Sequence, residues 1–329
     1  MKKISFSLIP LIFIIFIICI TLFSAQKVNS TTRITLQPLQ QGYNSSKVVI
    51  IAFDDSPRSQ FTLAKPILDK YGFKGSFFTV CNFVTGTGNH HDKTRMTWQD
   101  IKDLQNEGHD IESHTMTHTD LNFKTQQDLI YEVGGSKQCL LNHGINSTIF
   151  AYPASSGNQN ATVINAVSNY YDWARSGDAP LAFLHCNGYK IENNCNPISK
   201  RGLIPYENRY DVRNWSDRPK SPGPNELAIP LNRTQMLYQF INEVNLQSKY
   251  NKNGCINAIP IVVYHDFIKD SNLQYMPTRS ITEDTLFASE MKYLHDAGFK
   301  VLKASDLGYN PNNGYMYIRG PTNEMMKNC

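Results

Sequence analysis

Continuous apolar runs alternate with segments of helical periodicity along most of this chain. Residues 48–53 (VVIIAF) are apolar throughout and end at Asp54 and Asp55, a pattern typical of a parallel strand that is buried on both faces. Shorter and less uniformly apolar segments predict further strands at 74–80, 110–113, 149–152, 171–176, 258–264 and 300–302. Helical patterns lie between them, at 60–71, 97–108, 125–143, 161–170, 234–248 and 280–298.

Local signals mark where several of these helices begin and end. Gly72 follows the first helical segment and predicts its C-terminal cap. Three hydroxyl–acid pairs have the spacing of a capping box and predict helix starts: Thr97 with Asp100, Thr125 with Asp128, and Ser280 with Glu283.

The repeated alternation of strand and helix predicts an α/β domain with a parallel sheet, either a barrel or a doubly wound sheet. We expect this domain to span residues 47–308, preceded by a polar linker at 26–46 and followed by a C-terminal tail at 309–329. Residues 177–232 contain seven prolines and little periodicity, which predicts a long insertion.

The N-terminal 25 residues have the pattern of an export signal. Lys2 and Lys3 precede an apolar stretch from Leu8 to Phe23. Cleavage after Ala25 gives a secreted protein, whereas an uncleaved segment of this length gives an anchor that holds the domain on the extracytoplasmic face of the membrane. The sequence leaves both alternatives open, and it indicates no other contact with a membrane.

Composition narrows the class of protein further. Hydrophobic residues make up 41% of the chain, which is enough apolar surface to exclude disorder over most of its length. The net charge is only +4 and the basic residues are scattered, so a dedicated nucleic-acid binder is excluded. Neither feature indicates the oligomeric state.

Cysteines and glycosylation sequons agree with export. Six of the seven cysteines follow the N-terminal segment: Cys81, Cys139, Cys186, Cys195, Cys255 and Cys329. Six cysteines allow fifteen pairings, and the spacing favours only Cys186–Cys195 as a local disulfide. Six sequons begin at Asn29, Asn44, Asn146, Asn160, Asn214 and Asn232, and they predict a glycoprotein only weakly.

Titratable residues recur where the predicted strands end. Asp54 and Asp55 follow the first strand, His114 and His118 follow the third, Tyr152 ends the fourth, and His265 follows the run at 258–264. The carboxyl ends of parallel strands meet at one edge of a sheet, so these side chains are expected to lie together. One carboxylate and two imidazoles suit a catalytic divalent ion with open coordination positions. A second carboxylate and a third histidine supply a base and an acid for metal-assisted hydrolysis. A competing cluster, His90-His91-Asp92, lies in a Gly-flanked stretch and is expected to be a surface loop.

In order along the chain, four motifs resemble those of the polysaccharide deacetylases (NodB homology domain, carbohydrate esterase family 4). They are FDDSP at 53–57, GHDIESHTMTH at 108–118, FAYP at 150–153 and VVYHD at 262–266. The resemblance covers roughly residues 47–308. It implies a distorted (β/α) barrel of about seven parallel strands and a metal-dependent hydrolase, most often with zinc, that removes acetyl groups from N-acetylated polysaccharides or oligosaccharides.

The resemblance also implies roles for individual residues. Asp54 would be the general base and His265 the general acid, while Asp55, His114 and His118 would hold the metal. Tyr152 would offer its backbone N–H to the oxyanion, Val263 would form a wall of the acetyl-methyl pocket, and Trp173 would line the groove, with a core tryptophan as the alternative. Trp215, Tyr206 and Tyr210 of the insertion are expected to stack on sugar rings at the rim of that groove.

Two positions depart from the family pattern. Ser56 stands where the family usually has glycine. The arginine that many members carry in the third motif, to orient the catalytic aspartate, is missing from residues 148–151. Arg175 or Arg213 would have to replace it, and we favour Arg175 because a strand holds a side chain more firmly than a loop does.

Two other functions remain open from sequence alone. An Asp/His/His set also suits a non-haem Fe(II) oxygenase. A non-catalytic carbohydrate-binding relative would keep the fold, but the presence of both Asp54 and His265 argues against it.

Overall fold

The computed structural model describes residues 46–85, 93–177, 179–184, 198–199, 202–203, 209–217, 231–270, 281–312 and 315–319. The N-terminal apolar run, the His90-His91-Asp92 cluster, Tyr206 and the Cys186–Cys195 pair lie outside these residues. The chain divides into two units, 1–43 and 44–329, and every described element belongs to the second. Within the described part, no helix is both long and apolar enough to cross a bilayer.

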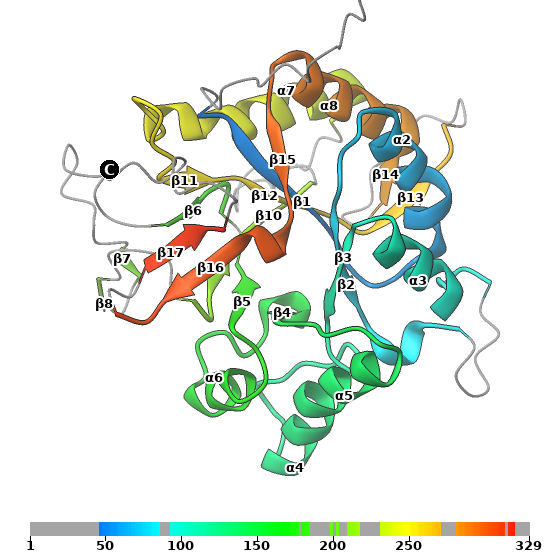
Figure 1. Cartoon of the computed structure of the whole chain (residues 1–329), viewed down its shortest axis with the longest axis vertical. Helices are drawn as coiled ribbons and strands as arrows, with labels where there is room; N and C mark the ends of the chain where they lie inside the picture. The colour runs from blue at the N-terminus through cyan, green and yellow to red at the C-terminus, as the bar shows by residue number, and fades with distance from the viewer. Residues whose placement is uncertain are drawn as a thin grey trace, which may run out of the picture. The chain divides into compact units, whose positions relative to one another are not determined.

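A parallel sheet forms the centre of this unit (Figure 1). Its spatial order is β10 (Trp215–Ser216), β12 (Ile261–Tyr264), β1 (Val48–Phe53), β2 (Ser76–Thr79), β3 (Asp110–Ser113), β4 (Ile149–Ala151), β5 (Trp173–Ser176) and β9 (Val212–Arg213). A further strand, β15 (Lys300–Leu302), pairs with the first half of β1.

The two edges of this sheet are joined by one short stretch of chain. β9 pairs with β5, and β10 pairs with β12, while only Asn214 separates β9 from β10. Residues 212–216 therefore connect the edges, and the sheet is a nearly closed barrel rather than an open doubly wound sheet. The barrel was expected, but this closing strand falls inside the stretch that the sequence predicted as an insertion.

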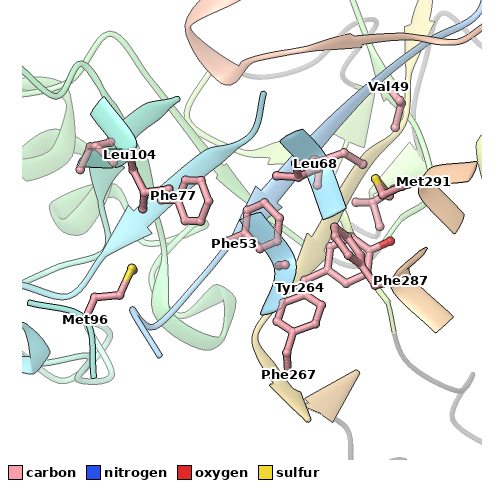
Figure 2. Close-up of a cluster of buried hydrophobic side chains, with 14 of the residues drawn as sticks. Val49, Phe53, Leu68, Phe77, Met96, Leu104, Tyr264, Phe267, Phe287 and Met291 are labelled. Carbon is pink, nitrogen blue, oxygen red and sulfur yellow. The ribbon is translucent and has the colours of Figure 1, made fainter. Parts of the chain in front are cut away.

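Alternate residues of each strand face opposite sides of the sheet, as the pleat requires. Val49, Ile51 and Phe53 of β1 pack outward in a cluster with helical side chains such as Leu68 and Phe287 (Figure 2). The intervening residues of β1 belong to a second cluster that draws side chains from strands around the barrel, including Phe78, Ile149, Trp173 and Val263, and so fills its interior. Both faces of the strands are buried, which explains their continuous apolar runs.

Helices cover the outer face of the sheet (Figure 1). They are α2 (Lys65–Lys70), α3 (Trp98–Asn106), α4 (Gln126–Leu129), α5 (Gly135–Asn142), α6 (Ala161–Ser168), α7 (Arg233–Asn245) and α8 (Asp284–Asp296). Two π-helical turns, η1 (Gln60–Ala64) and η3 (Ile130–Gly134), extend α2 and α5 toward their N-termini. The 3-10 turns are η2 (Cys81–Phe83), η4 (Pro153–Ser155), η6 (Leu246–Lys249) and η7 (Ala304–Asp306). The capping boxes of Thr97 and Thr125 are both formed.

Short two-stranded sheets surround the barrel. Their strands are β6 (Ala182–Phe183) with β11 (Ala258–Ile259), β7 (Ile198–Ser199) with β8 (Gly202–Leu203), β13 (Asp266–Ile268) with β14 (Ile281–Glu283), and β16 (Leu307–Asn310) with β17 (Tyr315–Ile318). Leu307, Met316 and Ile318 of the last hairpin join the interior cluster. The packed domain therefore continues past residue 308, where the sequence predicted a tail.

Two local predictions were wrong. The helix predicted from Ser280, a residue outside the described part of the chain, starts later, because Glu283 is the N-cap of α8 and residues 281–283 form β14. The predicted strand at 258–264 is broken at Pro260, which lacks the N–H that a ladder requires. Its first part pairs antiparallel with β6, and its second part pairs parallel with β1.

One disulfide joins distant parts of the described chain. Cys81 of η2 bonds to Cys139 of α5, with a sequence separation of 58 residues. Cys255 is disulfide-bonded as well. Sequence spacing favoured neither, since packing rather than proximity along the chain brought Cys81 and Cys139 together.

A buried carboxyl group inside the barrel generates a prediction about pH. Glu112 of β3 accepts hydrogen bonds from the Ser147 hydroxyl and from the Thr148 and Ile149 N–H groups. Burial, assisted by the charge of Asp110, nevertheless raises the pKa of Glu112 to about 8. The folded protein thus holds a proton that the unfolded chain releases near pH 4.5, so this contribution to stability is complete below pH 4.5 and is lost as pH rises toward 8.

Glu112→Gln should remove this loss of stability with rising pH, because the amide oxygen still accepts hydrogen bonds and the side chain does not ionise. We expect the variant to gain on the order of 1–3 kcal/mol over the parent between pH 5 and pH 8. Thermal and denaturant unfolding at several pH values measure the difference. A parallel pH dependence in parent and variant would contradict the prediction.

Candidate metal centre and active site

The carboxyl ends of the barrel strands bring the predicted residues together. Asp54 and Asp55 follow β1, while His114 and His118 follow β3, which lies two strands away across β2. Asp54 and His114 are 5% and 2% exposed, so the inner part of this site is shielded from solvent.

Asp55, His114 and His118 converge on one point. The Oδ1 atom of Asp55 lies 3.1 Å from Nε2 of His118 and 3.5 Å from Nε2 of His114. Nδ1 of His114 lies 2.8 Å from the carbonyl oxygen of Ala151, so this nitrogen carries the proton. Nε2 of His114 then presents a lone pair to a carboxylate oxygen, and two acceptors face each other across 3.5 Å.

A divalent cation fits this arrangement. Oδ1 of Asp55 is buried and receives no hydrogen bond that meets normal geometry. The three ligand atoms lie within 4.8 Å of one another. An oxygen and two imidazole nitrogens form a donor set that suits zinc and leaves positions open for substrate. The bond from His114 to Ala151 is the kind of outer contact that orients a metal-binding imidazole.

The surroundings of the site favour the ionised form of Asp55 and the protonated form of His118. Burial by itself raises the pKa of Asp55, but the adjacent imidazoles of His114 and His118 outweigh burial and hold that pKa well below its usual range. Burial lowers the pKa of His118, and its interactions with Asp55 outweigh this effect and raise it. Asp55 therefore presents a carboxylate to an ion, while His118 would have to release its proton to bind one.

A second acidic and histidine cluster, Asp69, Glu107 and His109, does not fit a metal. Nδ1 of His109 accepts a hydrogen bond from the Gly75 N–H, so the proton of the neutral ring is on Nε2 and neither nitrogen offers a free lone pair. Lys65 already pairs with Asp69 at 2.7 Å and with Glu107 at 2.5 Å. This cluster is an ion pair network on the outside of the barrel.

Left-handed backbone conformations concentrate at the site. Among the described residues, seven other than glycine have positive φ, and six of these follow β1, β3 or β4: Asp55, Ser56, Thr115, His118, Ala154 and Ser155. Such conformations cost roughly 1–2 kcal/mol each for residues with a Cβ atom. They persist only where surrounding contacts impose them, which is typical of functional loops.

The first of these loops is braced by the segment at 94–97. The guanidinium group of Arg95 donates to the Asp55 carbonyl at 2.7 Å and stacks on Phe83, whose ring in turn stacks on His118. The hydroxyl of Ser56 accepts from the Val80 N–H at 3.2 Å. Ser56 thus supplies a hydrogen bond that glycine could not. This bond offsets part of the cost of its left-handed backbone conformation.

The turn that carries His118 is held by a buried carboxylate. Glu132 of η3 accepts hydrogen bonds from the Met116 N–H at 3.1 Å, the Thr117 N–H at 2.9 Å and the Thr117 hydroxyl at 2.6 Å. Thr115 Oγ1 accepts from the His118 N–H at 2.9 Å. These bonds fix the turn between the two histidines.

Of the two candidate arginines, Arg175 contacts Asp54. Its guanidinium group is buried, forms an ion pair with the Asp54 carboxylate and stacks on Phe78. Its other terminal nitrogen donates to Oδ1 of Asn214 at 3.2 Å. Arg213 instead lies over the ring of Phe183. The ion pair crosses the barrel interior from β5 to β1.

Several expected roles do not agree with the geometry. The Tyr152 N–H donates to the Arg175 carbonyl at 3.2 Å, so it is not free to bind an oxyanion. Trp173 is 1% exposed inside the barrel and does not line an open groove. Tyr210 and Trp215 are 7% and 6% exposed and pack in hydrophobic clusters, where they offer no face to a sugar ring. Aromatic residues near a closing strand are needed to fill the core.

Two remaining predicted residues lie on or after β12, beside β1. Val263 is 1% exposed and pairs with Ala52 in register. His265 follows the strand and is partly exposed. Both therefore lie toward the carboxyl end of β12, next to the end of β1 that leads into Asp54 and Asp55.

Sequence reasoning missed the residues that hold the site. Glu132, Arg95 and Asn214 each come from a segment far from the motif that they contact. Neither periodicity nor motif spacing indicates such partners, because their function depends on distances in space.

Comparison with known proteins agrees with the motifs. The sequence model of the family described as polysaccharide deacetylase matches residues 41–171. The Bacillus subtilis (strain 168) protein YxkH, named for polysaccharide deacetylase activity, is 34% identical over 116 residues, which cover 35% of this chain and 39% of YxkH. A gellan lyase from Bacillus sp is 28% identical over 127 residues, covering 38% of this chain and 4% of the lyase. The chain thus spans well under half of either relative.

Solved structures with a similar chain path include a Streptomyces lividans family 4 carbohydrate esterase in complex with acetate. It is 11% identical, with a TM-score of 0.46 over 83% of this chain and 98% of that one. A family 4 acetyl xylan esterase from Clostridium thermocellum with a cobalt ion is 17% identical, with a TM-score of 0.44 over 79% and 89%. Residues 41–171 thus resemble the polysaccharide deacetylase family in sequence, and the matched segment holds the Asp54-Asp55 pair, His114 and His118.

The brace at Glu132 generates a prediction about the His118 turn. Glu132→Ala removes three hydrogen bonds to a charged acceptor and should lower the free energy of unfolding by about 2–4 kcal/mol. It should also weaken binding of zinc, because His118 is no longer held toward Asp55. Glu132→Gln is the matched control, since its one amide oxygen still accepts from the turn and its losses should be smaller. Unfolding curves and zinc competition with a chelator measure both effects, and a Glu132→Ala variant that equals the parent in both would contradict the assignment.

Proposed function

We propose that this polysaccharide deacetylase domain is a metal-dependent hydrolase that removes acetyl groups from N-acetylated sugars of the N-acetylglucosamine type, in a polymer or an oligomer. The observation that carries the proposal is that two hydrogen-bond acceptors, Asp55 Oδ1 and His114 Nε2, face each other. Beside them lies a second carboxylate, that of Asp54, which forms an ion pair with Arg175. The family match supports the class of reaction.

The metal ligands in this proposal are Asp55, His114 and His118. A divalent ion, for which zinc is our choice, would supply Lewis acidity that polarises the acetyl carbonyl. The remaining chemistry falls to side chains of the chain itself.

Asp54 is the proposed general base. Its carboxylate is buried and lies 3.9 Å from Nε2 of His114, so it borders the metal site without being its closest ligand. Asp54 takes a proton from the attacking water as the water oxygen bonds to the acetyl carbon. His265 gives a proton to the sugar nitrogen as the carbon–nitrogen bond breaks, which leaves acetate and a free amine.

Arg175 is the proposed positioning residue for the base. Its ion pair fixes one oxygen of Asp54, and Asn214 fixes the guanidinium group in turn. An oxyanion donor is also needed. Because the Tyr152 N–H is already bonded and Pro153 has none, we assign this role to the next N–H on the loop, that of Ala154, whose residue is exposed and left-handed.

We also propose that the domain works outside the cytoplasm. The N-terminal apolar run supports export or anchoring, and the Cys81–Cys139 disulfide is typical of proteins from oxidising compartments.

Acetate release from N-acetylglucosamine oligomers tests the function. The zinc-loaded parent should release acetate, and chelation should abolish the reaction. His114→Ala should lose both zinc and activity. Asp54→Asn is the matched comparison, because it should retain zinc while its rate falls by about 10²–10⁴-fold, the usual effect of losing a general acid–base group. Full zinc content and activity in His114→Ala would refute the metal site, and a parent without acetate release would refute the function.

Arg175→Lys tests the replacement of the missing arginine. Lysine retains the charge but not the planar group that bonds Asp54 and Asn214 at once. We expect kcat to fall by about 10-fold or more, with zinc content unchanged. Arg213→Lys is the control and should behave as the parent, since Arg213 lies against Phe183. Equal kcat in Arg175→Lys and the parent would show that the base needs no arginine.

A further inference from the structure

One buried amide joins the backbones of the two proposed proton-transfer residues. Gln60 is fully buried at the start of η1, shortly after the loop that carries Asp54 and Asp55. Its Nε2 donates to the Asp54 carbonyl at 2.5 Å and to the His265 carbonyl at 2.8 Å. Both amide hydrogens are therefore used, one on each residue.

These carbonyls lie where the backbone ladder ends. The last register pair between β1 and β12 is Phe53 with Tyr264, and the Asp54 N–H donates to the Tyr264 carbonyl at 2.9 Å. Beyond that pair the two segments separate, since Asp54 leads into a loop and His265 leads into β13, which pairs with β14. Gln60 bonds the first carbonyl group beyond the backbone ladder on each side. Its side chain therefore links the two segments where backbone hydrogen bonds no longer do.

The other end of the same amide is unfavourable for stability. Oε1 of Gln60 is buried and has no hydrogen-bond partner among the described residues. An unpaired buried acceptor destabilises a fold by about 1–3 kcal/mol. A residue present only to fill this space would therefore be better apolar, such as methionine.

A second buried glutamine provides a comparison on the same strand. Gln247 is also fully buried, and it bonds the opposite end of β1. Its Nε2 donates to the carbonyls of Val48 and Val244, and its Oε1 accepts from the Val48 N–H and from Asn251. Gln247 is completely paired at the amino-terminal end of the barrel, far from the loops of the site.

We propose that Gln60 is a positioning residue that sets the spacing and orientation of Asp54 relative to His265. This proposal rests on the function proposed above. Gln60 acts through the two carbonyls and does not touch the substrate. Without it, the loops after β1 and β12 would no longer share a donor, and the base and the acid would lose their common alignment across the scissile bond.

Gln60→Met tests this role, with Gln247→Met as the matched control. Methionine keeps the length of the side chain and its burial but donates no hydrogen bond. Zinc content, thermal unfolding, and kcat and KM across the pH range are measured on the full chain with N-acetylglucosamine oligomers. We expect Gln60→Met to keep its zinc and a KM within about twofold, while kcat falls by about 10–100-fold, because misplacement of about 1 Å has effects of this size. The pH profile of kcat/KM should also shift on its acidic or basic limb. Gln247→Met should lower the unfolding temperature but leave kcat and the pH profile unchanged.

Gln60→Asn covers the case in which Gln60→Met does not fold. Its amide still donates, but the side chain is one methylene shorter and so reaches one carbonyl rather than two. Its kcat should lie between those of the parent and Gln60→Met. Where Gln60→Met does not fold, kcat of Gln60→Asn should fall below that of the parent while zinc content stays unchanged. If the folded Gln60 variants keep the kcat and the pH profile of the parent and lose only stability, Gln60 is structural and this proposal is overturned while the function stands. If the parent releases no acetate, there is no acid–base pair for Gln60 to align, and both proposals fall.

Discussion

Closure of the parallel sheet by residues 212–216 is the constraint on which the site depends. In the order of the sheet, β5 lies four strands from β1, so an open sheet would place Arg175 far from Asp54. Because β9 pairs with β5 and β10 pairs with β12, the two edges meet and the two strands face each other across the interior. Asn214, at the join of β9 and β10, also bonds Arg175 directly. The same short stretch of chain thus closes the barrel and holds the arginine.

The site itself is held in a conformation that the chain would not adopt locally. Six left-handed residues follow β1, β3 and β4, and the loops after β1 and β3 are braced by residues from elsewhere in the fold. Arg95 holds the loop after β1, and Glu132 holds the turn after β3. The Cys81–Cys139 disulfide anchors η2, whose Phe83 stacks on His118. Strain around Asp55 and His118 is therefore balanced by contacts that other segments of the chain make.

The interior of the barrel is unusually polar toward its carboxyl end. Apolar residues such as Ile50, Trp173 and Val263 fill the middle of the interior. Asp54, His114 and Arg175 occupy the next inward-facing positions toward the carboxyl ends of their strands. The two-residue period of the strands explains this change. The side chains that face inward in the middle of each strand form the core, and the next inward position on β1 and β3 lies in the site.

The sequence by itself determined the class of fold and the chemical groups of the site. Apolar runs that ended in Asp54-Asp55, His114 and His265 marked the strands and the edge where function would lie, because burial on both faces and the strand-end rule act through local sequence. It was wrong about Tyr152, Tyr210 and Trp215, and it left open whether Trp173 lies in the core, because N–H bonding and burial are decided by neighbours in space. Spacing likewise favoured neither the Cys81–Cys139 disulfide nor the partners Glu132, Asn214 and Gln60. Only the closed barrel decided these, because a hydrogen bond or an ion pair depends on distances that the order of residues along a chain does not contain.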